Sequence, residues 1–91
     1  MDYKKVASDI IENVGGKENI KSMTHCFTRL RFVLRDNKKA DKDVVSRLEG
    51  VIQVVEASGQ FQVVLGSKVN KVYDQAVALV GGEMVGEGDV E

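Results

Sequence analysis

The sequence predicts an α+β domain whose elements follow the order α-β-β-α-β-β-α. Two observations lead to this prediction. Apolar residues recur at helical spacing near both ends of the chain and in a shorter central segment. Alternating apolar and polar residues mark two pairs of strands on either side of that segment. Two hairpins joined by a helix favour one mainly antiparallel sheet with the helices on one face.

The three predicted helices have residues suited to their starts and ends. Residues that can cap the starts are Asp2, Asp41 or a neighbour, and Ser67. Glycines that end the helices are Gly15-Gly16, Gly50 and Gly81-Gly82. The apolar faces consist of Tyr3, Val6, Ala7, Ile10, Ile11 and Val14, then Val44, Val45 and Leu48, then Val69, Val72, Tyr73, Ala76 and Val80.

Four strands are predicted from alternation. The first pair covers Ile20–His25 and Thr28–Leu34, and the second covers Val51–Ala57 and Gln60–Leu65 around a turn at Ser58-Gly59. In the second strand the apolar phase is Leu30, Phe32 and Leu34, and the other phase is Arg29, Arg31, Val33 and Arg35. In the fourth strand the phases are Phe61, Val63 and Leu65 against Gln60, Gln62 and Val64.

The composition indicates one small globular domain with an acidic end. The chain has 91 residues, of which 43% are hydrophobic and 30% charged. Four of its 14 acidic residues lie in residues 83–91, and all 13 Lys and Arg lie in residues 1–82. We therefore expect a domain over residues 1–82, followed by an acidic flexible linker over residues 83–91. The domain is too weakly basic to favour nucleic acid as a partner.

Several function classes are disfavoured by what the sequence lacks. No apolar run approaches the roughly 18 to 20 residues that a membrane span needs. The single cysteine excludes an internal disulfide and suits a reducing cytosol. It also excludes a zinc site made of several cysteines, so we expect no metal ion and no cofactor.

The segment from Thr24 to Phe32 contains the only cysteine and the only histidine of the chain. Cys26 lies between two predicted strands, and Arg29 and Arg31 follow it by three and five residues. The thiolate is the reactive form of cysteine, and nearby positive charge favours it. The two arginines point the same way from a strand and could hold a phosphoryl group on the sulfur. The segment therefore predicts a site that carries phosphate covalently on Cys26.

Other interpretations remain open from the residues alone. Free cysteine is commonly a small buried hydrophobe, and paired arginines on a strand can form a solvated face. A sugar- or peptide-binding module with an incidental cysteine is also compatible. A cysteine phosphatase is disfavoured, because its motif places five residues between cysteine and arginine on a Gly-rich loop. Here four residues separate Cys26 from Arg31, and the segment contains no glycine.

Four further residues could assist Cys26. The Thr28 hydroxyl could donate to a phosphoryl oxygen. His25 is an auxiliary candidate, although neighbours on an extended strand point to opposite faces, so a direct proton relay from His25 to Cys26 does not follow. Gln60 and Gln62 lie on the polar phase of the fourth strand and could be contact residues, but solvated glutamines are common there.

Several segments together resemble the enzyme IIB domain of the bacterial sugar phosphotransferase system, across nearly all of residues 3–80. They are Gly15-Gly16-Lys17-Glu18-Asn19-Ile20, His25-Cys26-Phe27-Thr28-Arg29-Leu30-Arg31-Phe32, Asp36 with Lys39-Ala40, Gly50-Val51-Ile52, Ser58 to Gly66, and Val69 to Tyr73. Within the system the chain is most similar to the glucose superfamily and its β-glucoside branch. The sucrose and trehalose branches are near neighbours.

The resemblance implies a phosphotransferase. In this family a phosphohistidine on enzyme IIA passes its phosphoryl group to the cysteine that matches Cys26. The phosphocysteine then passes it to a sugar held by the membrane-embedded enzyme IIC, here a β-glucoside by the closest branch. Arg29 and Arg31 match the two arginines that serve this transfer. The implied fold is a four-stranded antiparallel sheet with three helices on one face, in agreement with the predicted order.

The resemblance also bears on location and on the surface around the site. It implies a cytoplasmic domain attached to a membrane permease, with residues 83–91 leading toward an absent enzyme IIC domain. Alternatives are a sucrose or trehalose permease, a separate IIB chain, and a non-transport regulatory relative. A relay that meets two partners in turn favours a flat, exposed site around Cys26. Phe27 replaces the smaller residue often found after the cysteine and so alters that surface.

Overall fold

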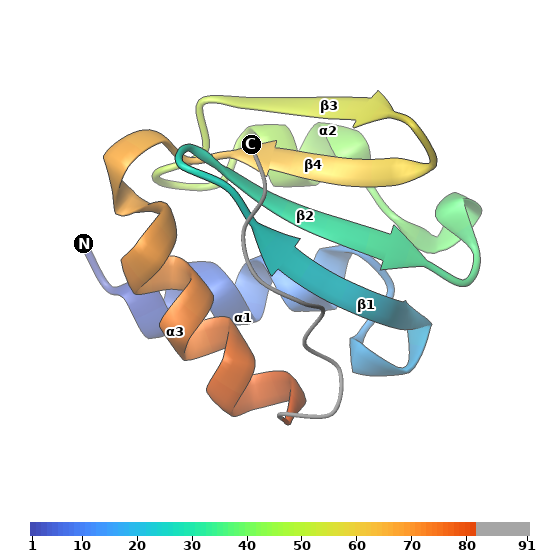
Figure 1. Ribbon diagram of the computed structural model, residues 1–91, viewed down its shortest axis with the longest axis horizontal. Coiled ribbons are helices and arrows are strands. Elements are labelled where there is room, and N and C mark those ends of the chain that lie inside the picture. Colours follow the sequence, from blue (N-terminus) through green and yellow to red (C-terminus); the bar gives the residue numbers. More distant parts are fainter. Residues whose placement is uncertain (82–91) are drawn as a thin grey trace.

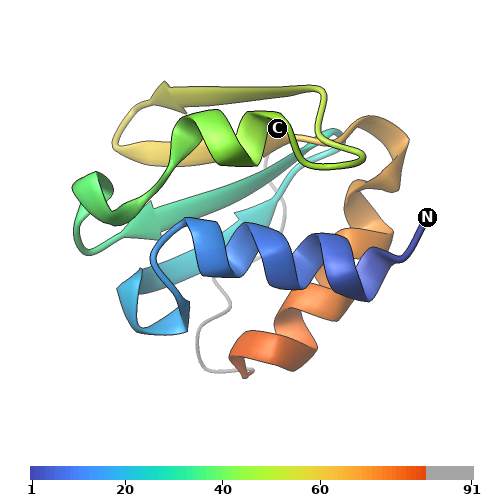
Figure 2. The same ribbon diagram turned by 180° about the vertical axis from the view of Figure 1, so that it is seen from behind.

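A computed structural model describes residues 1–81 of the chain as one antiparallel sheet with helices packed on it. The main elements are α1 (Tyr3–Asn13), β1 (Ile20–His25), β2 (Arg29–Leu34), α2 (Lys42–Ser46), β3 (Gln53–Ala57), β4 (Gln60–Val64) and α3 (Val69–Val80). Short 3₁₀ helices η1 (Lys17–Asn19), η2 (Asn37–Lys39) and η3 (Gly66–Lys68) lie between them. The strand order is β1-β2-β4-β3, and α1, α2 and α3 lie on one face (Figures 1 and 2). The predicted α+β fold is confirmed.

Aspartates begin two of the three α-helices, as predicted. The carboxylates of Asp2 and Asp41 each accept a hydrogen bond from the backbone N–H three residues later, both at 3.1 Å. The predicted Ser67 cap is wrong, because Ser67 lies inside η3 and α3 begins only after Lys68 without a side-chain cap. None of the helices in residues 1–81 has the length and apolar character needed to cross a bilayer.

The strand register places the arginines and the helices on opposite faces of the sheet. Arg31 lies opposite Thr24 of β1 and Gln62 of β4. The inward residues Leu30 and Phe32 are buried, whereas the outward residues Arg29, Arg31 and Val33 of β2 are half-buried. No helix of the described part covers the outer face of the sheet, which Figure 1 shows from the front. β2 and β3 begin one and two residues later than predicted, at residues 29 and 53, because the preceding residues belong to the connecting segments.

The hydrophobic core fills the layer between the sheet and the helices. Phe32 of β2 and Phe61 of β4 are its largest side chains, and they lie opposite each other in the register. Ile10 of α1 and Val72 of α3 close the core from the helical side. Burial of each such side chain stabilises the fold by roughly 1.5–3 kcal/mol. A slip of one residue in β2 would bury arginine here, so the core fixes which residues face outward.

A buried asparagine holds together the end of the β1–β2 hairpin that lies away from Cys26. The Asn19 side-chain amide donates to the carbonyls of Val14 and Asp36, at 2.7 and 2.9 Å. Its Oδ1 accepts from the Asp36 N–H at 2.9 Å, and its own carbonyl accepts from the Arg35 N–H at 2.8 Å. These bonds tie the end of α1 to both strands, so the hairpin that carries Cys26 is fixed at its base.

Candidate functional site

Cys26 lies in a short turn, residues 26–28, which joins β1 to β2 and is hereafter the 26–28 turn. The Cys26 N–H donates to the Arg29 carbonyl at 3.0 Å and closes the turn. The Thr28 carbonyl accepts two bonds, from the N–H groups of Leu65 at 2.8 Å and Gly66 at 3.0 Å. The turn is therefore tied to the end of β4 as well as to its own hairpin.

The side chains of the 26–28 turn differ sharply in exposure. Cys26 is only 1% exposed, whereas its neighbour Phe27 is 75% exposed and Thr28 is also exposed. The expectation of a flat, exposed site around Cys26 is therefore wrong for the thiol itself, which is buried although its neighbours in the turn are exposed. The closed turn directs the thiol side toward the protein and the aromatic ring toward solvent. Burial by itself fits the simple hydrophobic role left open above, so the function depends on what surrounds the turn.

His25, the last residue of β1, faces the helices and not the outer face. Its ring centroid lies 4.2 Å from that of Tyr73 on α3, at an interplanar angle of 51°. Its Nδ1 lies 3.0 Å from the carbonyl oxygen of Cys26. A carbonyl oxygen can only accept, so Nδ1 carries the proton and donates it in this bond. His25 thus contacts the backbone of the cysteine through a nitrogen that cannot act as a base there.

The two arginines lie on the outer face, as predicted, and a chain of side-chain amides supports one of them. The Arg29 guanidinium donates to Gln62 Oε1 at 2.8 Å, and Gln62 Nε2 donates to Gln60 Oε1 at 2.9 Å. Gln62 is only 5% exposed, although it lies on the face that no helix covers. The sequence pattern left open whether Gln62 is a contact residue or, as is more common, a solvated glutamine. The structure assigns it a supporting position under Arg29.

The outer face carries positive charge beside the turn. Its strand positions in the described structure include no carboxylate: they are Ser22, Thr24, Arg29, Arg31, Val33, Gln53, Val55, Ala57, Gln60, Gln62 and Val64. The cationic guanidinium groups of Arg29 and Arg31 favour an anion. Guanidinium groups suit phosphate in particular, because their planar fork can bond two oxygens at once.

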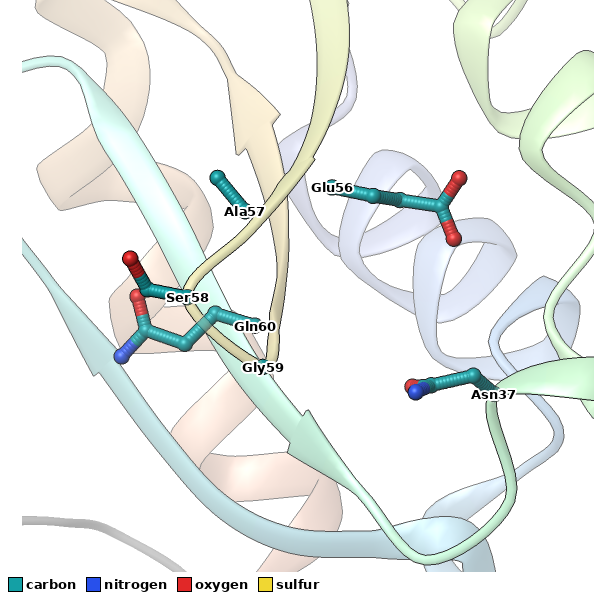
Figure 3. A pocket seen from close by; sticks show the side chains of 6 residues that line it. All are labelled: Asn37, Glu56, Ala57, Ser58, Gly59 and Gln60. Carbon is teal, nitrogen blue, oxygen red and sulfur yellow. The ribbon is translucent and has the colours of Figure 1, made fainter.

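A shallow pocket of about 240 Å³ lies elsewhere on the sheet (Figure 3). Six residues line it: Asn37, Glu56, Ala57, Ser58, Gly59 and Gln60. The β3–β4 turn in this pocket lies near the Leu34 end of β2, whereas Cys26 precedes its Arg29 end. The pocket is therefore separate from the cysteine site. Within residues 1–81, no group of three or more His, Cys, Asp and Glu is arranged to hold a metal ion.

The structure thus combines, on an antiparallel α+β scaffold, a cysteine in a strand-connecting turn with two outward arginines on the next strand. The chain belongs to the family described as phosphotransferase system, EIIB, whose model matches residues 8–41. A crystal structure described as one domain of the PTS system IIabc component from Clostridium difficile has the same fold. Its TM-score is 0.85 with 34% identity, over 98% of this chain and 90% of that one.

The curated relatives that this chain matches are PTS components whose names include EIIB. The beta-glucoside-specific EIIBCA component of Halalkalibacterium halodurans is 45% identical over 91 residues, which is 100% of this chain and 14% of that protein. The beta-glucoside-specific EIIBCA component of Dickeya chrysanthemi is 52% identical over 81 residues, which is 89% of this chain and 13% of that protein. The sucrose-specific EIIBC component of Bacillus subtilis is 51% identical over 75 residues, which is 81% of this chain and 16% of that protein. The chain thus spans about one seventh of the length of these relatives.

Proposed function

We propose that the chain is a phosphocarrier, which accepts a phosphoryl group on Cys26 and passes it to a sugar. One observation carries the proposal. Cys26 lies in the turn directly before a strand that presents Arg29 and Arg31 on the outer face of the sheet. Membership of the EIIB family supports the same chemistry. The residues expected to act are Cys26 as nucleophile, Arg29 and Arg31 on the phosphoryl oxygens, and Thr28 as a further donor.

The proposed relay consists of two phosphoryl transfers. In the first, the Cys26 sulfur attacks the phosphorus of a phosphohistidine on enzyme IIA. An S–P bond forms, the N–P bond breaks, and the proton lost by the thiol passes to the released imidazole. In the second, a sugar hydroxyl attacks the phosphocysteine. An O–P bond forms, the S–P bond breaks, and the hydroxyl proton returns to the released sulfur.

The protein's part in such transfers is mainly to position the groups and to screen charge. Arg29 and Arg31 supply that screening from β2, on the outer face beside the turn. The backbone N–H groups of Phe27 and Thr28 form no hydrogen bond with another described residue, and they can donate to phosphoryl oxygens. The Thr28 hydroxyl is exposed and adds a side-chain donor at the same turn.

Transfer requires the buried thiol to meet its partners, so the 26–28 turn must shift when a partner docks. Apolar side chains beside the turn suit such docking. Phe27 is 75% exposed, and Ile52 is 67% exposed and packs toward Gly66, whose N–H holds the Thr28 carbonyl. Exposed apolar groups beside a nucleophile favour transient protein contacts. We assign these contacts to enzyme IIA in the first transfer and to enzyme IIC in the second.

The relatives suggest the sugar and the cellular setting. Those named above are specific for beta-glucosides or sucrose, and their names join EIIB to component C, or to components C and A. We propose a β-glucoside as the sugar, with sucrose or trehalose as the alternative. We also propose that the domain lies on the cytoplasmic side of a membrane permease. The predicted linker over residues 83–91 lies outside the described residues.

Phosphorylation of the purified chain tests this function directly. The chain is incubated with phosphoenolpyruvate, the general phosphotransferase proteins and an enzyme IIA of the β-glucoside type, and its intact mass is then measured. We expect one phosphoryl group per chain, stable to base but released by iodine, as a thiophosphate is. Release to a β-glucoside should require membranes that contain enzyme IIC. An unmodified mass with every active enzyme IIA supplied would contradict the proposal.

Phe27 is expected to contribute to docking and not to stability. Because its side chain is 75% exposed, Phe27→Ala should change the free energy of unfolding by less than about 0.5 kcal/mol. It should raise the enzyme IIA concentration needed for half-maximal phosphorylation several-fold. Leu79→Ala is a matched control, since Leu79 is also exposed but lies near Gly16 and Lys17, at the other end of β1. Equal effects of the two variants would contradict docking through Phe27.

Gln62 is expected to hold Arg29 in place for transfer. Gln62→Leu keeps a side chain of similar size but removes the acceptor of the Arg29 guanidinium, which lies at 2.8 Å. A hydrogen bond to a charged group contributes about 1.5–3 kcal/mol, so we expect transfer to slow by at least about ten-fold. Gln60→Leu should have a smaller effect, because Gln60 reaches Arg29 only through Gln62. Single-turnover rates compare the two variants, and an unchanged rate in Gln62→Leu would contradict the role.

A further inference from the structure

The contacts of His25 connect helix α3 to the backbone of Cys26. On one side, the imidazole ring packs against Tyr73, with ring centroids 4.2 Å apart. On the other side, its Nδ1 donates to the Cys26 carbonyl at 3.0 Å. Both rings are half-buried, and Tyr73 also packs against the hydrophobic core. A ring fixed by such packing loses little further freedom when it donates its hydrogen bond.

The hydrogen bond of His25 complements the bonds at the other end of the turn. The Thr28 carbonyl is held by the N–H groups of Leu65 and Gly66 at the end of β4. The Cys26 carbonyl is held from the opposite side by His25. The peptide groups at the two ends of the 26–28 turn are thus fixed by different parts of the fold: the residues that follow β4, and His25 of β1, whose ring packs on α3. These two attachments keep Cys26 buried while Phe27 lies in solvent.

We propose that His25 is a positioning residue for Cys26 and that Tyr73 holds its ring in place for this purpose. His25 acts on the backbone of the nucleophile and not as its base, because the nitrogen that faces Cys26 already donates its proton to the carbonyl. The Nδ1–H bond sets the orientation of the Cys26 peptide and limits opening of the turn. The inference rests on the proposed phosphocarrier function for its role in transfer, but its structural part can be measured without phosphate.

The alkylation rate of the Cys26 thiol by iodoacetamide measures how often the turn opens, since this is the only cysteine and it is buried. His25→Leu keeps an apolar side chain against Tyr73 but removes the donor. We expect alkylation to become about three- to ten-fold faster, the effect of losing one ordinary hydrogen bond. His25→Asn should return the rate to near that of the original chain, because Asn Nδ2 occupies the same place along the side chain as His Nδ1.

Tyr73 provides a second, independent arm of the test. Tyr73→Leu should accelerate alkylation in the original chain but not in the His25→Leu background, because it acts through the imidazole ring. Tyr73→Phe keeps the ring and should behave as the original chain does. Additive effects of Tyr73→Leu and His25→Leu would overturn the link between the two residues. Melting temperatures of all variants separate opening of the turn from general loss of stability.

Phosphoryl uptake from enzyme IIA completes the experiment with the same variants. We expect His25→Leu to slow uptake although its thiol is more accessible, because the Cys26 peptide is no longer held in the orientation that transfer needs, and we expect His25→Asn to restore uptake. If His25→Asn accelerates alkylation as much as His25→Leu does, or if neither changes alkylation or uptake, the positioning role is wrong. If the original chain accepts no phosphate while the alkylation pattern holds, the phosphocarrier function fails and the attachment of the turn stands.

Discussion

Replacement of Cys26 by serine or alanine is expected to reduce phosphoryl transfer to background. The reason is chemical. A thiol ionises far more readily than a hydroxyl, and its thiolate is both a good nucleophile and a tolerable leaving group. A serine hydroxyl would need a positioned base, and the His25 nitrogen that faces residue 26 already donates to a carbonyl. Alanine removes the nucleophile altogether. Intact mass after incubation with the complete phosphorylation system measures the effect.

The burial of Cys26 decides how these two variants must be compared. Serine would place a hydroxyl where the present side chain is 1% exposed, at an expected cost of about 1–3 kcal/mol of stability. Alanine leaves only a small void and should cost less. Both melting temperatures are therefore measured beside transfer. A folded serine variant that still relays phosphate to sugar at the original rate would remove Cys26 from the proposed mechanism.

Local sequence patterns predict the elements of this fold better than their arrangement. The alternation around Leu30 and Phe32 identifies β2 and the face it buries, because the side-chain period of a strand is two. The insertion of β4 between β2 and β3 depends on contacts such as that of Arg29 with Gln62, which are 33 residues apart. The failed Ser67 cap has a local cause, since a 3₁₀ turn occupies the place of the expected helix start.

The site is predicted by residue type and spacing, but its geometry is not. The spacing of Cys26, Arg29 and Arg31 predicts the proposed nucleophile and its cations, because both depend on one strand and its turn. The burial of Cys26 depends on how the 26–28 turn closes against neighbouring elements. The contact of His25 with Tyr73 requires α3 to pack beside β1. Such facts arise from tertiary packing, for which the local sequence has no periodic signal.

Arg29 and Arg31 are expected to act on the phosphoryl group and to contribute little to the fold. Each charge-assisted hydrogen bond to a phosphoryl oxygen contributes about 1.5–3 kcal/mol, which corresponds to roughly 10- to 150-fold in rate. Arg29→Gln and Arg31→Gln should each slow transfer to sugar by roughly 10- to 150-fold. Both side chains are half-buried on the outer face, so the free energy of unfolding should fall by only about 1 kcal/mol.

Arg35→Gln is the matched control, because Arg35 follows β2 at the end away from Cys26 and is exposed. It changes net charge by the same amount, so any effect of overall charge on docking appears in all three variants. Arg→Lys at residues 29 and 31 keeps the charge but loses the planar fork, and should recover only part of the rate.

Single-turnover transfer from the phosphorylated chain to a β-glucoside, with enzyme IIC membranes in excess, isolates the chemical step. If residues 29 and 31 matter only for folding, their Gln variants will melt several degrees lower and yet transfer at the rate of the Arg35→Gln variant. If they bind the phosphoryl group, melting will be nearly unchanged while transfer falls by one to two orders of magnitude.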